Sequence, residues 1–146
     1  MITIRTMTAQ DCHRVAELEK QLFSMPWSED GFKSAVAIVQ NVFLVAEEAG
    51  EICGYIGMYH ALDEGEITNV GVAPWKQNQG IGWKLMQAAL SMAKQKGITQ
   101  VVLEVRVSNA SAIHLYEKCG FTNCGIRKGF YEQPKEDAYI MLYNQP

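Results

Sequence analysis

Residues 69–96 combine a short strand, a glycine-containing loop and an amphipathic helix, and this order constrains the fold more than any other stretch. The strand NVGVAP is followed by the loop QNQGIG. After Gly80 the apolar residues recur on one helical face and Gly97 supplies a stop, which predicts a helix; they are Ile81, Leu85, Ala88, Ala89 and Met92. Gly80 and Gly82 let a ligand approach the main chain, and a helix N-terminus favours an anion. The loop is therefore a candidate phosphate site, although a tight strand-to-helix turn could use the same residues.

Two common phosphate-binding motifs are absent from this loop. It has neither the Walker spacing G-x-x-x-x-G-K-[ST] nor the dinucleotide fingerprint G-x-G-x-x-G. An ATP loop and a dinucleotide site are therefore not supported. A pyrophosphate held by main-chain N–H groups is compatible with the spacing.

The elements on either side of this helix predict an α/β fold with a mixed sheet. Apolar β-forming residues between 42 and 73 are interrupted by two glycine-containing turns, as in an antiparallel meander of three strands. QVVLEVRV at 100–107 is a strand by its β-branched content. A helical crossover returns the chain to the same edge of the sheet, so the strands that flank the helix should be parallel.

Both ends of the chain add elements to this prediction. Residues 2–5 alternate like a short strand, and Thr8 with Asp11 forms a capping box for a first helix. Ser28 is a candidate N-cap for a second, short helix.

After residue 107 the sequence predicts one more helix and one more strand. SNASAIHLYEKCGF is helical, with Asn109 as candidate N-cap and Gly120 beyond its last turn. YIMLY at 139–143 closes the chain as a strand.

The composition describes a single soluble domain over residues 1–146. Hydrophobic residues make up 48% and charged residues 20%. A net charge of −3 gives no general attraction to nucleic acid or to membranes, and no signal peptide or long apolar run occurs, so we expect a cytoplasmic monomer or weak dimer. The four cysteines and three histidines lack metal-ligand spacing, so no metal is expected. Reduced, mostly buried thiols are the favoured interpretation, with a catalytic thiol as the alternative.

Several motifs, in order, resemble one enzyme superfamily. Gln77, Gly80 and Gly82 match the Q/R-x-x-G-x-G/A pattern of the GNAT superfamily, the acetyl-CoA-dependent N-acetyltransferases. PWS, LEVRVSNASAIHLYEKCGF, GIRKGFY and EDAYIM extend the similarity over nearly the whole chain, and are similar to the ribosomal-protein-alanine N-acetyltransferases. The resemblance implies a mixed central β-sheet with helices on both faces and parallel strands splayed apart at the acetyl-CoA site.

The resemblance also implies which residues bind the coenzyme. Main-chain N–H groups would hold its pyrophosphate; they carry over to Gln77, Asn78, Gln79, Gly80, Ile81 and Gly82. Val70 and Val72 would bind the pantetheine arm through main-chain groups, beside a bulge at Gly71 that splays the strands, and the Val72 N–H would polarise the thioester carbonyl. Asn109 would cap its helix, contact the coenzyme, or do both.

Two residues are candidates for proton transfer. Glu104 interrupts an apolar strand, where a cross-strand ion pair with Arg106 or another basic residue would also explain it. The resemblance makes it the general base that accepts a proton from the substrate amine through water. Tyr116 lies at helical spacing from Ile113 and Ala112 and could be a core residue. The resemblance instead places its hydroxyl beside the departing sulfur as a proton donor.

The acceptor site should include an arginine and three aromatic residues. Trp27, Arg127, Phe130 and Tyr131 carry over to it, although each aromatic could equally belong to the rim or the core. Phe130 departs from the R-x-x-Y-Y-like pattern by one hydroxyl, which puts one substrate hydrogen bond in doubt.

The resemblance makes the N-terminal α-amine of a protein the expected acceptor, specifically the N-terminal alanine of a small-subunit ribosomal protein. Acetylation of a small amine or a lysine side chain by the same residues is one alternative. A non-catalytic acyl-CoA-binding module is another, and it would need neither Glu104 nor Tyr116.

Overall fold

The computed structural model describes all residues, 1–146, and alternates strands with helices along most of the chain. In chain order the elements are β1 Thr3–Thr6, the 3-10 turn η1 Ala9–Asp11, α1 Cys12–Leu22, α2 Glu29–Val36, β2 Val42–Glu48, β3 Glu51–Ala61, β4 Glu64–Val72, η2 Pro74–Lys76, α3 Ile81–Gln95, β5 Gln100–Arg106, α4 Ala110–Lys118, β6 Thr122–Glu132 and β7 Lys135–Asn144. None of the helices combines the length and the apolar character needed to cross a membrane.

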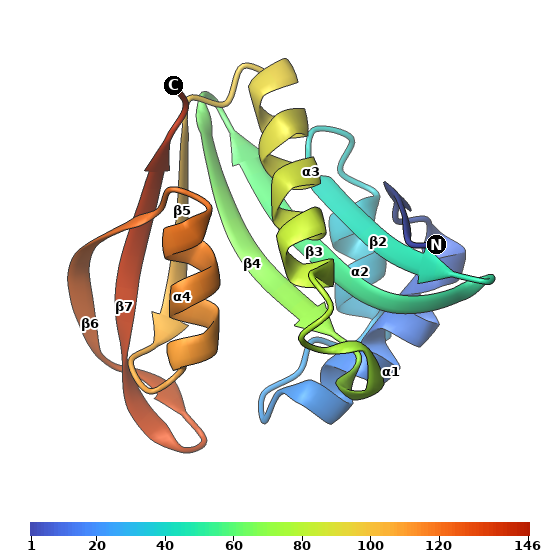
Figure 1. Cartoon of the computed structure of the whole chain (residues 1–146), viewed down its shortest axis with the longest axis horizontal. Coiled ribbons are helices and arrows are strands. Elements are labelled where there is room, and N and C mark those ends of the chain that lie inside the picture. Colours follow the sequence, from blue (N-terminus) through green and yellow to red (C-terminus); the bar gives the residue numbers. More distant parts are fainter.

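The strands form one seven-stranded mixed sheet in the order β1-β2-β3-β4-β5-β7-β6. All neighbouring strands are antiparallel except β4 and β5, which are parallel and are joined by α3. The structure therefore confirms the mixed sheet, the meander β2-β3-β4 and the parallel pair on either side of the long helix. Figure 1 shows β4 and β5 close together near the C-terminus and diverging toward the start of α3.

The parallel pair is hydrogen-bonded over only part of its length. Residues 64–67 of β4 pair with residues 100–103 of β5, and no pairing continues beyond Ile67 and Leu103. A register shift opposite Gly57 and Met58 leaves Thr68 as the extra residue of a bulge in β4. The splayed strands are as predicted, but the bulge lies at Thr68 and not at Gly71. Gly71 is required for a different reason, because a Cβ atom there would lie 2.5 Å from the Tyr55 ring.

Helices cover both faces of this sheet. Neighbouring residues of β3 point to opposite faces, so the surroundings of Gly54 and Tyr55 identify the two layers. A Cβ on Gly54 would meet Leu85 and Ile81 of α3. On the other face, the Tyr55 ring packs edge-on against Phe32 of α2. The ring of Trp27 packs beside them, with its centroid 5.2 to 6.2 Å from those of three neighbouring aromatic rings. In Figure 1, α3 and α4 lie in front of the sheet and α1 with α2 behind it.

Local capping fixes where the helices begin. Ser28 Oγ accepts the N–H of Gly31, and Asn109 Oδ1 accepts the N–H of Ala112, so both predicted N-caps are present. The predicted capping box also forms, although its first turn is the 3-10 turn η1. Its aspartate, Asp11, receives two hydrogen bonds of 2.8 and 2.9 Å from the guanidinium of Arg5 in β1.

Strand β6 was not predicted from the sequence. It forms a hairpin with the longer-than-expected β7 and is the edge of the sheet. Most residues of β6 are exposed and none is buried, and the pairing of β6 with β7 shifts register twice. An edge strand with this composition has no alternating apolar pattern, which is the signal by which strands are recognised.

Candidate active site

A cleft of about 910 Å³ opens where β4 and β5 separate. Residues from both faces of the sheet line it: the α1–α2 loop (residues 23–28), the loop before α3, helix α4 along its length, and the turn between β6 and β7. The predicted site residues that line it are Trp27, Val70, Val72, Gln77, Asn78, Gly80, Ile81, Gly82, Glu104, Asn109, Tyr116 and Tyr131. Gln79, Arg127 and Phe130 do not line it.

The loop at residues 77–82 includes two residues in the left-handed backbone region. Asn78 and Gly80 have positive φ angles of 63° and 81°, and Gly80 stands directly before α3. The side chain of Gln77 donates to the carbonyl of Val72 at 3.1 Å, which ties the loop to the end of β4. A Cβ on Gly82 would lie 3.1 Å from Leu115 of α4, so glycine permits the close approach of α3 and α4. No side chain caps the N-terminus of α3, and Gly80, Ile81 and Gly82 at this end of the helix line the cleft.

The main chain of β4 presents polar groups to the cleft. Ala73 donates its N–H to Cys53 of β3 at 2.8 Å. Because successive residues of a strand direct their main-chain N–H and C=O groups to opposite sides, these groups of Val70 and Val72 point away from β3. The carbonyl of Val72 accordingly accepts from Gln77 and not from β3. With β5 already splayed away, this edge can take up a ligand lying like an additional strand.

Glu104 projects from β5 into the cleft with its side chain 13% exposed. Burial raises the pKa of its carboxyl, repulsion from Glu66 raises it further, and Arg127 opposes both effects. The nearest cation is Arg127, whose Nε lies 3.8 Å from Glu104 Oε2. The ion pair considered with Arg106 does not form, because Arg106 pairs with Glu136 at 3.1 Å, and Glu104 instead has the other basic residue, Arg127, as its partner. A partly buried carboxylate with a raised pKa is suited to accept a proton.

Tyr116 of α4 belongs to the core and to the cleft at once. The residue is only 8% exposed and its ring packs against Phe121 at 6.0 Å between ring centroids, yet it lines the cleft. Burial, and to a smaller degree the proximity of Tyr131, raises the pKa of its hydroxyl. The hydroxyl therefore stays protonated at neutral pH. Asn109, which caps α4, lines the same cleft.

The residues expected around the acceptor divide into two groups. Trp27 and Tyr131 line the cleft, and Tyr131 lies under the guanidinium of Arg106 at 4.2 Å. Arg127 and Phe130 stand outside it on β6, where the guanidinium lies 5.7 Å from the ring of Phe130. Arg127 nevertheless reaches the site through its contact with Glu104.

Glu19 is a cleft residue that was not predicted from the sequence. This carboxylate of α1 is only 3% exposed and lines the cleft. One signal could have revealed it: Glu19 occupies the core-facing stripe of α1 with Val15, Leu18 and Leu22, where an apolar residue is expected.

The rim of the cleft joins segments that are distant in sequence. Ser24 of the α1–α2 loop donates its hydroxyl to the carbonyl of Gln133 in the β6–β7 turn. Arg106 donates to the carbonyls of Gln133 and Pro134 at 3.1 and 2.8 Å. The α1–α2 loop and the β6–β7 turn are therefore in direct contact at this end of the cleft.

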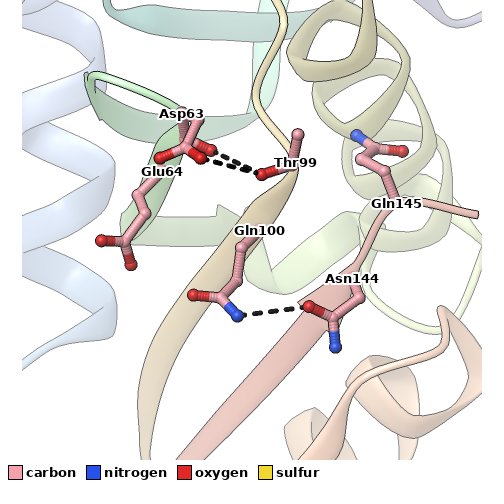
Figure 2. A pocket seen from close by; sticks show the side chains of 6 residues that line it. All are labelled: Asp63, Glu64, Thr99, Gln100, Asn144 and Gln145. Carbon is pink, nitrogen blue, oxygen red and sulfur yellow. Dashed lines mark hydrogen bonds between the residues drawn. The ribbon is translucent and has the colours of Figure 1, made fainter.

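A second hollow, of about 420 Å³, lies at the opposite end of the parallel pair and has only polar lining residues. Figure 2 shows that these side chains bond to one another: Thr99 with Asp63, and Gln100 with Asn144. The main chain adds a bond from the Thr99 N–H to the Asp63 carbonyl at 2.8 Å. These contacts connect residues 63 and 99 at the start of the β4–β5 pair, and residues 100 and 144 of β5 and β7.

The chain matches a known enzyme family over most of its length. Residues 12–121 match the model of the acetyltransferase (GNAT) family, which is most of the chain. The chain belongs to the GNAT acetyltransferase family and is an acyltransferase.

Individual proteins of this family are similar to the chain over nearly its whole length. N-alpha-acetyltransferase RimI of Mycobacterium tuberculosis is 36% identical over 146 residues, which covers 96% of this chain and 90% of that protein. The crystal structure of the ribosomal-protein-S18-alanine N-acetyltransferase from Escherichia coli has a TM-score of 0.91 at 32% identity, and covers 99% of this chain and 94% of that one. The fold is also that of yncA from Salmonella typhimurium, a structure described with its cofactor acetyl-CoA (TM-score 0.85, 23% identity, 99% and 94% covered).

Proposed function

We propose that this protein transfers an acetyl group from acetyl-CoA to the N-terminal α-amine of a protein, and that its substrate is the N-terminal alanine of ribosomal protein S18. The observation that carries the proposal is the cleft between the splayed strands, which brings the loop 77–82, Glu104 and Tyr116 together. The relatives named for S18-alanine and for N-alpha acetylation support the choice of acceptor.

The residues of the cleft fit the coenzyme. The N–H groups at the start of α3 suit its pyrophosphate, and the outward main chain of Val70 and Val72 suits its amide-containing arm. Acetyl-CoA would supply the acetyl group as a thioester, whose carbonyl is open to direct attack by an amine. No residue of this chain needs to carry the acetyl group in that reaction.

Two side chains would handle the protons. Glu104 accepts the proton that the amine loses as its nitrogen bonds to the acetyl carbon, and its raised pKa favours this role. Tyr116 donates its phenolic proton to the sulfur as the carbon–sulfur bond breaks. The products are the acetylated amine and free coenzyme A, and solvent restores both side chains.

The energetics of deprotonation favour an α-amine. An α-amine with a pKa of about 7.8 costs roughly 1 kcal/mol to deprotonate at pH 7, against roughly 4.6 kcal/mol for a lysine side chain with a pKa of about 10.4. One carboxylate base, Glu104, is sufficient for the smaller of these two free energies of deprotonation.

Acetylation of defined amines tests the proposal. The protein is incubated with acetyl-CoA and three acceptors: a peptide with the S18 N-terminal sequence, the same peptide blocked at its N-terminus and carrying a lysine, and a polyamine. Mass spectrometry should place the acetyl group on the free α-amine alone. Acetyl-lysine or acetyl-polyamine as the main product would favour the small-amine or side-chain alternative. No product, with coenzyme still bound, would make the protein a binding module.

A further inference from the structure

Glu19 is a buried carboxylate at the cleft to which the proposed reaction gives no role. It is 3% exposed, and no lysine, arginine or histidine forms an ion pair with it. A buried carboxylate is costly unless hydrogen bonds compensate the loss of water. The donors that compensate Glu19 therefore indicate what it is there to hold.

Three neutral donors from three different segments meet at this carboxylate. The main-chain N–H of Trp27 donates to Oε2 at 3.0 Å, and the side-chain amide of Asn69 donates to the same oxygen at 3.1 Å. The hydroxyl of Tyr55 donates to Oε1 at 2.7 Å. Glu19 thus connects the α1–α2 loop, β4 and β3 at a single point.

Two of these contacts belong to walls of the cleft. Trp27 is in the α1–α2 loop, and Asn69 follows the bulge residue Thr68 on the splayed part of β4. Thr68 donates its hydroxyl to the side-chain oxygen of Asn69 at 2.6 Å, so the bulge itself is tied into the network. Ser24 connects the other end of the loop to the β6–β7 turn, and Ser28 begins α2. Glu19 therefore attaches the α1–α2 loop to the splayed part of β4.

We propose that Glu19 is a positioning residue for the acceptor: it fixes the α1–α2 loop, with Trp27, against the bulged part of β4, so that the acceptor amine meets the donor in a productive geometry. This inference rests on the proposed function. The coenzyme loop 77–82 and α3 lie on the opposite face and make no hydrogen bond to Glu19. Loss of the anchor should therefore impair acceptor use and spare coenzyme binding.

Glutamine is the informative conservative replacement. Its one oxygen can accept from Trp27 and Asn69, while its amide nitrogen donates to the Tyr55 hydroxyl, which can turn to accept. The Glu19→Gln protein keeps the anchor and loses the charge. The Glu19→Ala protein loses the anchor entirely, and Asn69→Ala removes only the attachment to β4.

The test compares acceptor and coenzyme parameters in these variants. Glu17→Ala is the control, because Glu17 lies on the same helix with a half-exposed side chain and pairs only with exposed His13 and Arg14. Glu19→Ala and Asn69→Ala should raise the KM for the acceptor peptide by about tenfold or more, since small displacements in a catalytic cleft have effects of this size. Their Kd for coenzyme A, measured by calorimetry, should stay within about threefold of wild type. Glu19→Gln and Glu17→Ala should resemble wild type in both.

Two results would overturn the proposal. One is an unchanged acceptor KM in folded Glu19→Ala and Asn69→Ala proteins. The other is a loss of coenzyme affinity in step with the acceptor KM, which would make Glu19 a general stabiliser of the fold. A Glu19→Gln protein with the alanine phenotype would also contradict anchoring by hydrogen bonds, and Asn69→Ala decides the matter if Glu19→Ala does not fold.

Hydrogen exchange provides a readout that does not depend on the acceptor's identity. Asn69→Ala and Glu19→Ala should accelerate exchange of the amides at 23–28, including the Trp27 N–H, and leave those of α3 unchanged. If wild type acetylates no peptide, the proposed function fails while this experiment still tests the anchor. Unchanged exchange at 23–28 would refute the anchor even in an active enzyme.

Discussion

Replacing Gly71 by alanine tests how tightly the splayed part of β4 packs against the layer of α1 and α2. The added Cβ would lie 2.5 Å from Cζ and Oη of Tyr55 and 2.7 Å from its Cε1. Ordinary contacts of a Cβ atom begin near 3.4 Å, so the ring would have to move by about 1 Å. Tyr55 is fully buried against Phe32 and donates its hydroxyl to Glu19, so it has no free space to enter.

The expected destabilisation follows from these contacts. Overpacking of a core site costs about 1 to 3 kcal/mol, and disturbing a hydrogen bond to a charged group costs about 1.5 to 3 kcal/mol. Alanine also restricts the unfolded chain, which returns about 0.4 to 1 kcal/mol. We therefore expect Gly71→Ala to lower the free energy of unfolding by about 3 kcal/mol.

Urea unfolding followed by circular dichroism measures this difference. The control is Gly125→Ala in β6, where the nearest atom to the new Cβ would be at the ordinary distance of 3.7 Å. That variant should unfold within about 0.5 kcal/mol of wild type. If Gly71→Ala matched the control, the close packing of Tyr55 under β4 would be wrong, and with it the geometry of the Glu19 network.

Three further predictions concern proton transfer and acid stability. Glu104→Gln should lower kcat by about 10²- to 10⁴-fold with unchanged coenzyme affinity. In wild type, kcat should rise with pH as this carboxyl, whose pKa is raised, loses its proton, and the variant should lack this rise. Steady-state kinetics across pH measure both profiles, and coinciding profiles would remove Glu104 from the mechanism. Tyr116→Phe should slow turnover about tenfold or more in a folded protein, and full activity would leave this residue to the core alone. Arg5 lowers the pKa of Asp11 from 3.8 to about 2, so its stabilisation is complete above the ordinary pKa and is lost as the pH falls toward 2. Thermal unfolding of Asp11→Asn should therefore depend less on pH than wild type across that window, and equal slopes would contradict the ion pair.

Local signals in the sequence were sufficient for the elements that lead to the cleft. Ser28 and Asn109 cap their helices because a short polar side chain satisfies an N–H group within the same turn, which needs no tertiary information. The parallel strands followed from the helical crossover between them. The positive φ of Gly80 is likewise a local requirement of the loop.

Features that depend on distant partners were not predictable in the same way. Strand β6 pairs only with β7, and its exposed faces erase the alternation that would identify it. Gly71 was expected to form a bulge, yet it is needed for the ring of Tyr55, which lies on another strand. The partners of Glu19 are 8, 36 and 50 residues away, so its hydrogen bonds could not be read from α1 alone.

Family patterns located the catalytic candidates, and the structure supplies their surroundings. Glu104 and Tyr116 share one cleft with the coenzyme loop, although Arg127 and Phe130 lie outside it. The contact between Arg127 and Glu104 could not be inferred without the pairing of β5, β7 and β6. The chemical roles of these residues remain predictions for the experiments above.

Calorimetric titration with coenzyme A tests the central claim most directly, because the account depends on the main-chain N–H groups before and at the start of α3. We predict one molecule bound per chain, and a severe loss of affinity in Gly80→Val, since a β-branched residue does not tolerate the φ of 81° found there. No heat of binding with the wild-type protein, or equal affinity in folded Gly80→Val, would contradict the account.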